Sequence, residues 1–333
     1  MKKPSLIDVA RKAKVNISTV SRTINQNGKI GAATQEVVRQ AMRDLGYTPN
    51  RVARRLRTQG GKTHLLGLII PNIQNPFFAD LARGVEDVAY QHRFAVMLCN
   101  YDEDPAKELF YLEVLQAESV DGIILPPLRA NVQAVQRIVQ QGTPVVCVDR
   151  SVTNTALDRV EVDNRLGAFE AVEFLLAQGH RRIGLIGGPK DSSTGRQRLL
   201  GYRDAHAKAG IALKGDCLRF GDYKQSSGYR LTNELLDLAQ PPTALFVCNN
   251  LMTIGALEAI HARRLRIPKD IGLLSYDDLP LAAVFNPPLS VVRQPAYEVG
   301  KGAAELLFKR LDQPRGPATR LRLRSTLIIR KST

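Results

Sequence analysis

Hydrophobic and polar positions in the first fifty residues follow the spacing of short helices. The apolar residues of the first segment share one helical stripe, and they are Leu6, Val9, Ala10 and Ala13. Ser5 precedes Asp8 by three residues, which matches the capping box at the start of a helix. The pattern therefore predicts a first helix that begins just after Ser5.

A second and a third helix follow after short breaks. Asn16 is a good N-cap for a helix that buries Val20 and Ile24, and the turn before it is only three residues long. Two short helices joined in this way form a helix-turn-helix. Val38, Ala41 and Leu45 share one face of the third helix, and Gly46 stands where a left-handed C-terminal residue is expected.

From residue 65 onward, short apolar runs alternate with longer helical segments. The runs include 65–70, 94–99, 122–125, 144–148, 182–186, 244–248 and 272–274. Continuous apolar strands separated by helices predict parallel sheets that are covered on both faces. About 270 residues is large for one such sheet, so we expect two doubly wound lobes. A ligand should then bind at the carboxyl ends of the strands, in the cleft between the lobes.

The composition fits a soluble protein with two or three domains. The chain has 333 residues, of which 44% are hydrophobic and 24% are charged, and it has no apolar stretch long enough to span a membrane. The basic N-terminus lacks the apolar segment of a signal peptide, so a cytoplasmic location is expected. The four cysteines are widely spaced, which predicts reduced structural thiols and no metal site.

The positive charge is concentrated at the beginning of the chain. Residues 1–62 contain 14 basic and three acidic residues, a net charge of +11, whereas the other 271 residues carry only +4. A localised excess of this kind indicates a polyanionic partner for the first segment. A solvated basic tail is the simpler alternative, but the helical pattern of the segment argues against it.

The ordered motifs of the first fifty residues resemble the lactose-repressor family of bacterial transcription regulators. They are LIDVA at 6–10, STVSR at 18–22 and LGYTPN at 45–50. Lys14 and Gly31 depart from the family pattern, which usually has a turn-permissive residue and a serine N-cap at these places. A lysine with positive φ would be slightly strained, and glycine is a tolerable N-cap.

The resemblance implies that the second helix reads bases in a major groove. Ile17, Ser18 and Arg22 would contact bases, with Arg22 able to form two hydrogen bonds to guanine. Thr19 and Ser21 would bind phosphates and set the register. Packing of Ile17 on the first helix remains the alternative.

Residues 50–57 combine helical periodicity with clustered arginines. Eight such residues cannot form a stable helix alone, so we expect them to become ordered on a partner. The resemblance implies a hinge helix in the minor groove, with Leu56 as a wedge that kinks the duplex. The residues assigned to this DNA contact are Asn50, Arg51, Ala53, Arg54 and Leu56. A plain linker with incidental apolar residues is the alternative.

The larger part of the chain resembles the periplasmic-binding-protein-like core of the same family. Segments such as "GHRRIGLIGGP" and "IPKDIGLLSYDD" carry this resemblance. The implied effector-binding residues are Asn75, Phe77, Phe78, Asp149, Thr194, Arg196, Arg198, Tyr223, Asn249, Asp277 and Gln294. Which of Arg196 and Arg198 faces the ligand stays open. Phe77 and Phe78 could be core residues, and Asp149 could be a cap.

An enzyme is not expected, because the chain lacks phosphate-loop, dinucleotide and metalloprotease motifs. No cofactor is expected either. Carboxylates, amides, arginines and aromatic rings suit a sugar or sugar derivative. The alternatives are a purine-type regulator with a nucleobase corepressor, a cytoplasmic sugar-binding protein and a sugar-modifying enzyme.

The predicted protein is therefore a DNA-binding repressor controlled by a small effector. It would bind a near-palindromic operator as a homodimer, with a tetramer as the larger alternative. The expected domains are a headpiece at 1–49, a hinge and linker at 50–62, and a core at 63–333. In the core, one lobe would comprise 63–161 and 294–324, and the other 162–293 and 325–333.

Overall fold

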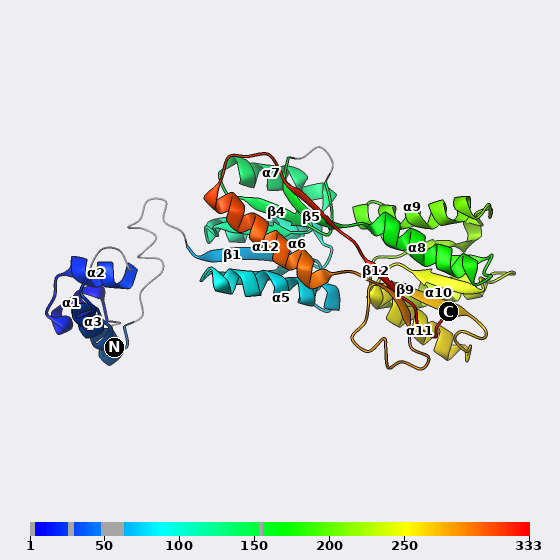
Figure 1. Ribbon diagram of the computed structural model, residues 1–333, viewed down its shortest axis with the longest axis horizontal. Helices are drawn as coiled ribbons and strands as arrows, with labels where there is room; N and C mark the ends of the chain where they lie inside the picture. The colour runs from blue at the N-terminus through cyan, green and yellow to red at the C-terminus, as the bar shows by residue number, and fades with distance from the viewer. Residues whose placement is uncertain (1–3, 26–29, 48–62, 153–155) are drawn as a thin grey trace. The chain divides into compact units, whose positions relative to one another are not determined.

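The computed structural model describes residues 4–25, 30–47, 63–152 and 156–333. The chain divides into two compact units, Met1–Thr63 and His64–Thr333 (Figure 1). The predicted hinge residues Asn50, Arg51, Ala53, Arg54 and Leu56 lie outside the described residues. We refer to the helices of the first unit as the headpiece and to the second unit as the core.

The headpiece consists of α1 (Leu6–Ala13), α2 (Ile17–Asn25) and α3 (Ala32–Leu45). The predicted capping box is confirmed, because Asp8 N donates to Ser5 Oγ and Ser5 N donates to Asp8 Oδ2 at 2.8 Å. Lys14 ends α1 with a φ of 52°, so the strained lysine expected in the turn is present. The three helices bury a small core around Val9, Val20 and Val38.

The other headpiece boundaries also follow from local chemistry. Asn16 Oδ1 accepts a hydrogen bond from Ser18 N at 3.0 Å, as expected of an N-cap of α2. Gly31 begins α3 without a side-chain cap, and Gly46 ends it with a φ of 59°. Gly46 can adopt this left-handed conformation at little cost because it has no Cβ atom.

The first lobe of the core is built on a parallel six-stranded sheet. Its strand order is β11-β5-β4-β3-β1-β2. The strands are β1 (Leu65–Ile70), β2 (Ala95–Asn100), β3 (Gly122–Leu125), β4 (Val145–Val148), β5 (Asp158–Val162) and β11 (Arg320–Leu323). Alternate side chains of the strands enter two different hydrophobic clusters, one on each face of the sheet.

Helices cover both faces of this first sheet. α5 (Pro76–Gln91) and α12 (Ala296–Asp312) cover one face, and α6 (Pro105–Ala117) and α7 (Val132–Gln140) cover the other. The short 3-10 helix η1 (Arg129–Asn131) leads into α7. α12 packs along α5 although more than 200 residues separate the two helices in the chain (Figure 1).

The second lobe repeats this design with one difference. Its strand order is β12-β10-β9-β8-β6-β7, and β12 runs antiparallel to β10. The strands are β6 (Ile183–Gly187), β7 (Leu218–Phe220), β8 (Ala244–Val247), β9 (Gly272–Tyr276), β10 (Ser290–Arg293) and β12 (Thr326–Ile328). The second sheet is therefore parallel, as predicted, except at its edge strand β12, which the chain forms after it returns from the first lobe. An antiparallel edge strand on an otherwise parallel sheet is common.

Helices also cover both faces of the second sheet. α8 (Asn164–Ala177) and α9 (Ser193–Lys208) cover one face, and α10 (Gln225–Leu236) and α11 (Asn250–Ala262) cover the other. The short 3-10 helix η2 (Gly215–Cys217) leads into β7. Each sheet is thus enclosed by two helical layers, which confirms the doubly wound architecture of both lobes.

Three segments of the chain connect the two lobes. The cleft predicted from the strand pattern lies between the lobes. The chain passes from β5 to α8, from β10 to α12, and from β11 to β12, the last as the long extended segment drawn in red in Figure 1.

All four cysteines are buried free thiols, as predicted, and burial raises the pKa of Cys147 and of Cys248 to about 12. No helix among the described residues is both long and apolar enough to cross a bilayer.

Candidate functional site

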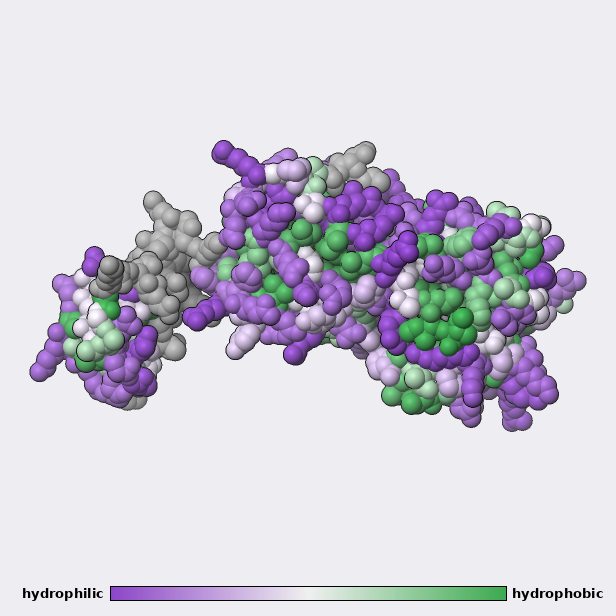
Figure 2. Space-filling view, viewed as in Figure 1, coloured by the Kyte–Doolittle hydropathy of each residue, from purple (hydrophilic) through white to green (hydrophobic). Residues whose placement is uncertain are grey.

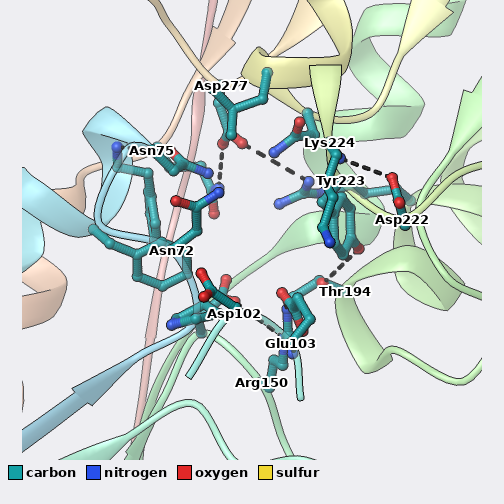
Figure 3. Close-up of a pocket in the computed structure, with 18 residues that line it drawn as sticks. Asn72, Asn75, Asp102, Glu103, Arg150, Thr194, Asp222, Tyr223, Lys224 and Asp277 are labelled. Atoms are coloured by element: carbon teal, nitrogen blue, oxygen red, sulfur yellow. Dashed lines mark hydrogen bonds and ion pairs between the residues drawn. The ribbon is translucent and has the colours of Figure 1, made fainter. Parts of the chain in front are cut away.

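A small polar cavity, which we call the inner chamber, lies where strands of the two lobes end. Its volume is about 50 Å³. Figure 3 shows side chains from both lobes converging on it. Ten residues of the predicted effector site line it, and they are Asn75, Phe77, Phe78, Asp149, Thr194, Arg198, Tyr223, Asn249, Asp277 and Gln294. A cavity of this size holds only a few water molecules, so any effector requires the lining to rearrange.

Three helices begin at the inner chamber, each with a polar N-cap. Asn75 caps α5, Ser192 caps α9 and Asn249 caps α11 through their side-chain oxygens. These helix N-termini direct their positive dipole ends towards the cavity. The chamber therefore favours ligands that carry oxygen acceptors.

Arg198 is buried beside Asp277. Its Nε donates to Asn164 Oδ1 at 2.8 Å, its Nη1 donates to the Cys248 carbonyl at 2.6 Å, and Nη1 lies 4.0 Å from Asp277 Oδ2. The guanidinium also lies 3.8 Å from the centre of the Tyr276 ring, which adds a cation–π contact. These contacts fix the position of the arginine before any ligand arrives.

Two of the carboxylates that line the chamber, Asp149 and Asp277, are hard to ionise because they are buried. Burial raises the pKa of Asp149 to about 6, although Arg150 and Arg198 oppose the shift. Burial also raises the pKa of Asp277, against the opposing effects of Arg198 and of the hydrogen bond from Gln294. Hydroxyl groups of a ligand would stabilise the charged forms by donating to them.

The lobes are already in contact across the cleft. Asn250 Nδ2 donates to Asn75 Oδ1 at 2.8 Å, and Ser151 N donates to Ser193 Oγ at 3.1 Å. Both bonds join one lobe to the other. Amide and hydroxyl groups thus bridge the two lobes of the core directly.

Tyr223 fills part of the space that a ligand would need. Its hydroxyl lies 3.1 Å from Thr194 Oγ1 and 3.3 Å from Ser192 Oγ. The ring lies directly against Gly188, where a Cβ atom would come within 2.2 Å of it. A glycine is therefore required at 188 for this arrangement.

Strained backbone is concentrated around the chamber. Five residues that line it have positive φ values between 54° and 71°, and they are Asp102, Glu103, Asp149, Tyr223 and Asp277. Such conformations cost about 1–3 kcal/mol each for residues other than glycine, and they cluster at binding and catalytic sites. The strain aims these side chains into the cleft.

The structure shows which of the two arginines, Arg196 or Arg198, faces the inner chamber. Arg198 is buried in the inner chamber, whereas Arg196 is exposed and lines an adjacent crevice. Phe77 and Phe78 both line the chamber and also belong to the core of the first lobe.

Several further residues line the chamber beyond the effector set that the family resemblance implies. They are Asn72, Asp102, Glu103, Arg150, Asp222, Lys224 and Leu251. Asn72, Asp102, Arg150 and Asp222 follow strands closely, and this position by itself makes them candidates for the cleft. Lys224 and Leu251 begin helices, and the sequence offers no comparable sign for them.

In the headpiece, α2 presents exposed polar side chains and no acidic residue. Ser18 and Arg22 are exposed, and Ile17 is 43% exposed and lies outside the buried cluster. Thr19 and Ser21 are partly buried. This surface can approach a polyanion without a repelling carboxylate of its own.

The three acidic residues of the described headpiece are all paired elsewhere. Asp8 pairs with Arg11 at 3.6 Å, Asp44 with Lys12 at 3.1 Å and Glu36 with Arg43 at 2.6 Å. All six residues belong to α1 and α3. The negative charge of the unit is thus kept off α2.

A basic helix-turn-helix unit joined to a two-lobed core with a polar chamber defines a ligand-controlled DNA-binding regulator. Residues 5–50 match the model of the bacterial regulatory proteins of the lacI family, and residues 172–333 match that of the periplasmic binding protein-like domain. The chain is 34% identical to the HTH-type transcriptional repressor CytR of Escherichia coli (strain K12), over 98% of this chain and 95% of the relative. The chain therefore belongs to the lacI family of bacterial regulatory proteins.

Solved structures agree with this assignment over nearly the whole chain. The lac repressor dimer bound to operator and the anti-inducer ONPF has a TM-score of 0.87 and 29% identity, covering 99% of both chains. The transcriptional regulator CelR in complex with cellobiose has a TM-score of 0.76 and 31% identity, covering 99% of this chain and all of the other. The predicted fold and the prediction of a DNA-binding regulator rather than an enzyme are confirmed.

Proposed function

We propose that this repressor is controlled by a sugar or sugar derivative bound in the inner chamber. The observation that carries the proposal is a set of buried polar groups that lack partners within the described residues. Arg150 Nε and Gln294 Oε1 are buried and have no hydrogen bond, and Arg150 Nε lies 3.8 Å from Asp149 Oδ2, beyond hydrogen-bond distance. A ligand dense in hydroxyl groups can accept from the first atom and donate to the second.

The DNA contact of the proposal rests on the surface of α2 and on the hinge expected from the family resemblance. Ile17, Ser18 and Arg22 would read bases in the major groove, while Thr19 and Ser21 would bind phosphates. The arginines and Leu56 of residues 50–57 would engage the minor groove. Because its partner would be the chromosome, the protein would act in the cytoplasm, on the nucleoid.

The active form would be a homodimer that matches a near-palindromic operator. Exposed hydrophobic residues support a self-contact of the core, among them Leu98 on the edge strand β2, Phe110 on α6, and Leu281 and Val284 after β9. Figure 2 shows hydrophobic surface on the second lobe, where α11 and β9 lie in Figure 1. The lac repressor that resembles this chain was solved as a dimer on its operator.

A thermal-shift screen of the full-length protein tests the effector class. The probes are neutral sugars, sugar phosphates and purine bases, each against wild type and the variant Asp277→Asn. A probe present at 100 times its Kd should stabilise the folded chain by about 2.7 kcal/mol. We expect neutral sugars to raise the Tm of wild type and to lose this effect in Asp277→Asn.

The matched control is Glu173→Gln, which removes an exposed carboxylate of α8 that pairs with Lys208. This variant should respond to each probe as wild type does. Stabilisation by a purine base alone would overturn the sugar proposal and support the nucleobase alternative. A sugar that weakens operator binding would be an inducer, and one that strengthens it would be a corepressor.

A further inference from the structure

The turn between α1 and α2 contains a strained residue whose side chain the turn does not use. Lys14 ends α1 with a φ of 52° and a ψ of 41°, which is the left-handed conformation. Its backbone N–H closes the helix by donating to the carbonyls of Ala10 and Arg11. Glycine would make the same backbone hydrogen bonds without the steric cost that a Cβ atom brings in this conformation. The fold of the turn therefore gives no reason for a lysine at this position.

The ammonium group of Lys14 is free to bind a partner. The side chain is exposed, and within the described residues it forms no ion pair and no hydrogen bond. The acidic residues of the headpiece do not compete for it, because Asp8 already pairs with Arg11 and Asp44 with Lys12. The charge of Lys14 is thus available to an anion from outside the chain.

Most other cations of the headpiece are engaged within it. Four of the lysines and arginines in its described residues contact acceptors on α1 or α3, and they are Arg11, Lys12, Arg39 and Arg43. In that part of the chain, the cations left without such an acceptor are Lys14 and Arg22. Arg22 lies on α2, and Lys14 lies in the turn that leads into α2. The free positive charge of the described headpiece is therefore concentrated on the element that would approach DNA.

The position of Lys14 in the chain places it near the edge of the groove that α2 would enter. The residues proposed to read bases begin at Ile17, the first residue of α2. Lys14 precedes Ile17 by three residues, so their Cα atoms are at most about 11 Å apart. The major groove is about 12 Å wide, and phosphates border it on both sides. A long side chain that starts just outside the groove can therefore reach a phosphate.

We propose that Lys14 binds a backbone phosphate of the operator at the edge of the major groove. This inference rests on the proposed contact of α2 with DNA. It adds a contact at a position where the family pattern has a turn-permissive residue. A lysine is a point charge on a flexible stem, and phosphates are the same in every sequence, so the contact strengthens binding to all duplexes alike.

Anisotropy titration of the full-length protein tests the contact. The ligands are an operator selected from random duplexes and an unselected duplex of equal length, each measured at several salt concentrations. Lys14→Asn removes the charge and leaves a residue that tolerates the left-handed conformation. We expect this variant to lose the same factor of affinity for both duplexes. The slope of log Kobs against log salt concentration should become less steep by about 0.9 for each protomer bound.

Two control variants separate the charge of Lys14 from its position. Lys14→Arg keeps the charge and should keep the salt slope of wild type. Lys12→Gln removes a charge that pairs with Asp44 on the headpiece itself, and it should also keep the slope.

Circular dichroism melting separates a DNA contact from a structural role. The headpiece of Lys14→Asn should melt no lower than that of wild type, because asparagine relieves the strain of the turn. A lower melting temperature that accompanied the loss of affinity would show that Lys14 supports the turn, and it would overturn the inference.

The base preference of the variants distinguishes this inference from the proposed contact of α2. Lys14→Asn should keep the base preference of wild type, whereas Arg22→Ala should relax it at one base pair. An unchanged salt slope in Lys14→Asn, with relaxed preference in Arg22→Ala, would overturn the phosphate contact and leave the α2 contact in place. A changed base preference in Lys14→Asn would also overturn it. If neither variant changed DNA binding, both proposals would be contradicted.

Discussion

The headpiece and the core place their arginines in opposite environments. Arg22 on α2 is exposed to solvent, whereas Arg198 and Arg150 in the core are almost wholly buried among carboxylates and carbonyls. Exposed cations interact weakly and at long range, and salt screens them. Buried cations are held in one geometry and are costly to leave unpaired. The headpiece is thus suited to a long polyanion, and the core to one small ligand of matching shape.

The largest expected effect is the removal of a buried core arginine. Arg198→Ala should leave Asn164 Oδ1 and the Cys248 carbonyl without their donor, and it removes the cation 4.0 Å from Asp277. A buried charge left unpaired costs about 3–5 kcal/mol, so urea unfolding of the variant should show a loss of that size. Effector binding should disappear with it.

Arg196→Ala is the matched control because Arg196 lies two residues away and is exposed. Its free energy of unfolding should stay within about 0.5 kcal/mol of wild type. If the two variants were equally stable, Arg198 would not hold the charges of the core as described.

The next effect is the pH dependence of the core, to which Glu108 should contribute together with Asp149 and Asp277. The Glu108 side chain is fully buried, and burial raises its pKa to about 7 although Leu128 N and Asn131 donate to it. Between about pH 4.5 and 7 the folded chain keeps a proton that the unfolded chain has released, so stability falls as pH rises. A shift of this size corresponds to about 3 kcal/mol.

Urea unfolding of wild type and Glu108→Gln at pH 5 and at pH 8 measures this contribution. Wild type should lose more stability between the two values than the variant does. Identical pH dependence in the two proteins would show that Glu108 does not titrate in this range.

The headpiece should respond to pH with the opposite sign. Hydrogen bonds from Arg43 and Lys12 lower the pKa of Glu36 and of Asp44 respectively. A lowered carboxyl pKa gives stability that is present above the unfolded value and lost as pH falls through the folded one. Lowering the pH should therefore destabilise the headpiece. It should stabilise the core, because the buried carboxyl groups there favour the protonated form.

A smaller effect is expected from the exposed arginine of α2. Arg22→Ala should weaken binding to the selected operator by about 1–3 kcal/mol and relax the preference at one base pair. Selection of binding sites from random duplexes, followed by anisotropy titration, measures both quantities. The free energy of unfolding of the core should not change. If the variant kept the full base preference of wild type, Arg22 would not contact bases.

The smallest effect concerns the start of the headpiece. Ser5→Ala removes the side chain that accepts from Asp8 N at the beginning of α1. Loss of such a cap costs about 1 kcal/mol. The headpiece should melt at a lower temperature in circular dichroism, whereas an unchanged transition would mean that Asp8 alone closes the helix.

The sequence predicted most of the fold because local and tertiary signals agree there. The apolar runs at β1 and β3 appear with the predicted bounds, and the other predicted runs shift by only a residue or two. β5 and β11 were not singled out, because the strands DRVEV and RLRL carry many charges. Those charges pair between neighbouring strands, as Arg320 does with Glu161, and only the sheet brings them together.

The site was predictable where a residue follows a strand and less so where contacts cross the lobes. Asp149 and Asp277 were identified by position and resemblance, and both line the inner chamber. The hydrogen bond from Asn250 to Asn75 joins residues 175 positions apart, and no local sequence pattern predicts it. The choice between Arg196 and Arg198 also needed the structure, since only the orientation of α9 separates them.

The central claim is that a ligand bound in the core cleft changes the affinity of the headpiece for DNA. Anisotropy titration of the selected operator with full-length protein tests it directly, with and without the sugar that gives the largest thermal shift. The operator Kd should change by about 5–150-fold at saturating sugar, and operator should change the sugar Kd by the same factor. Two Kd values that are each unaffected by the other ligand would contradict the account.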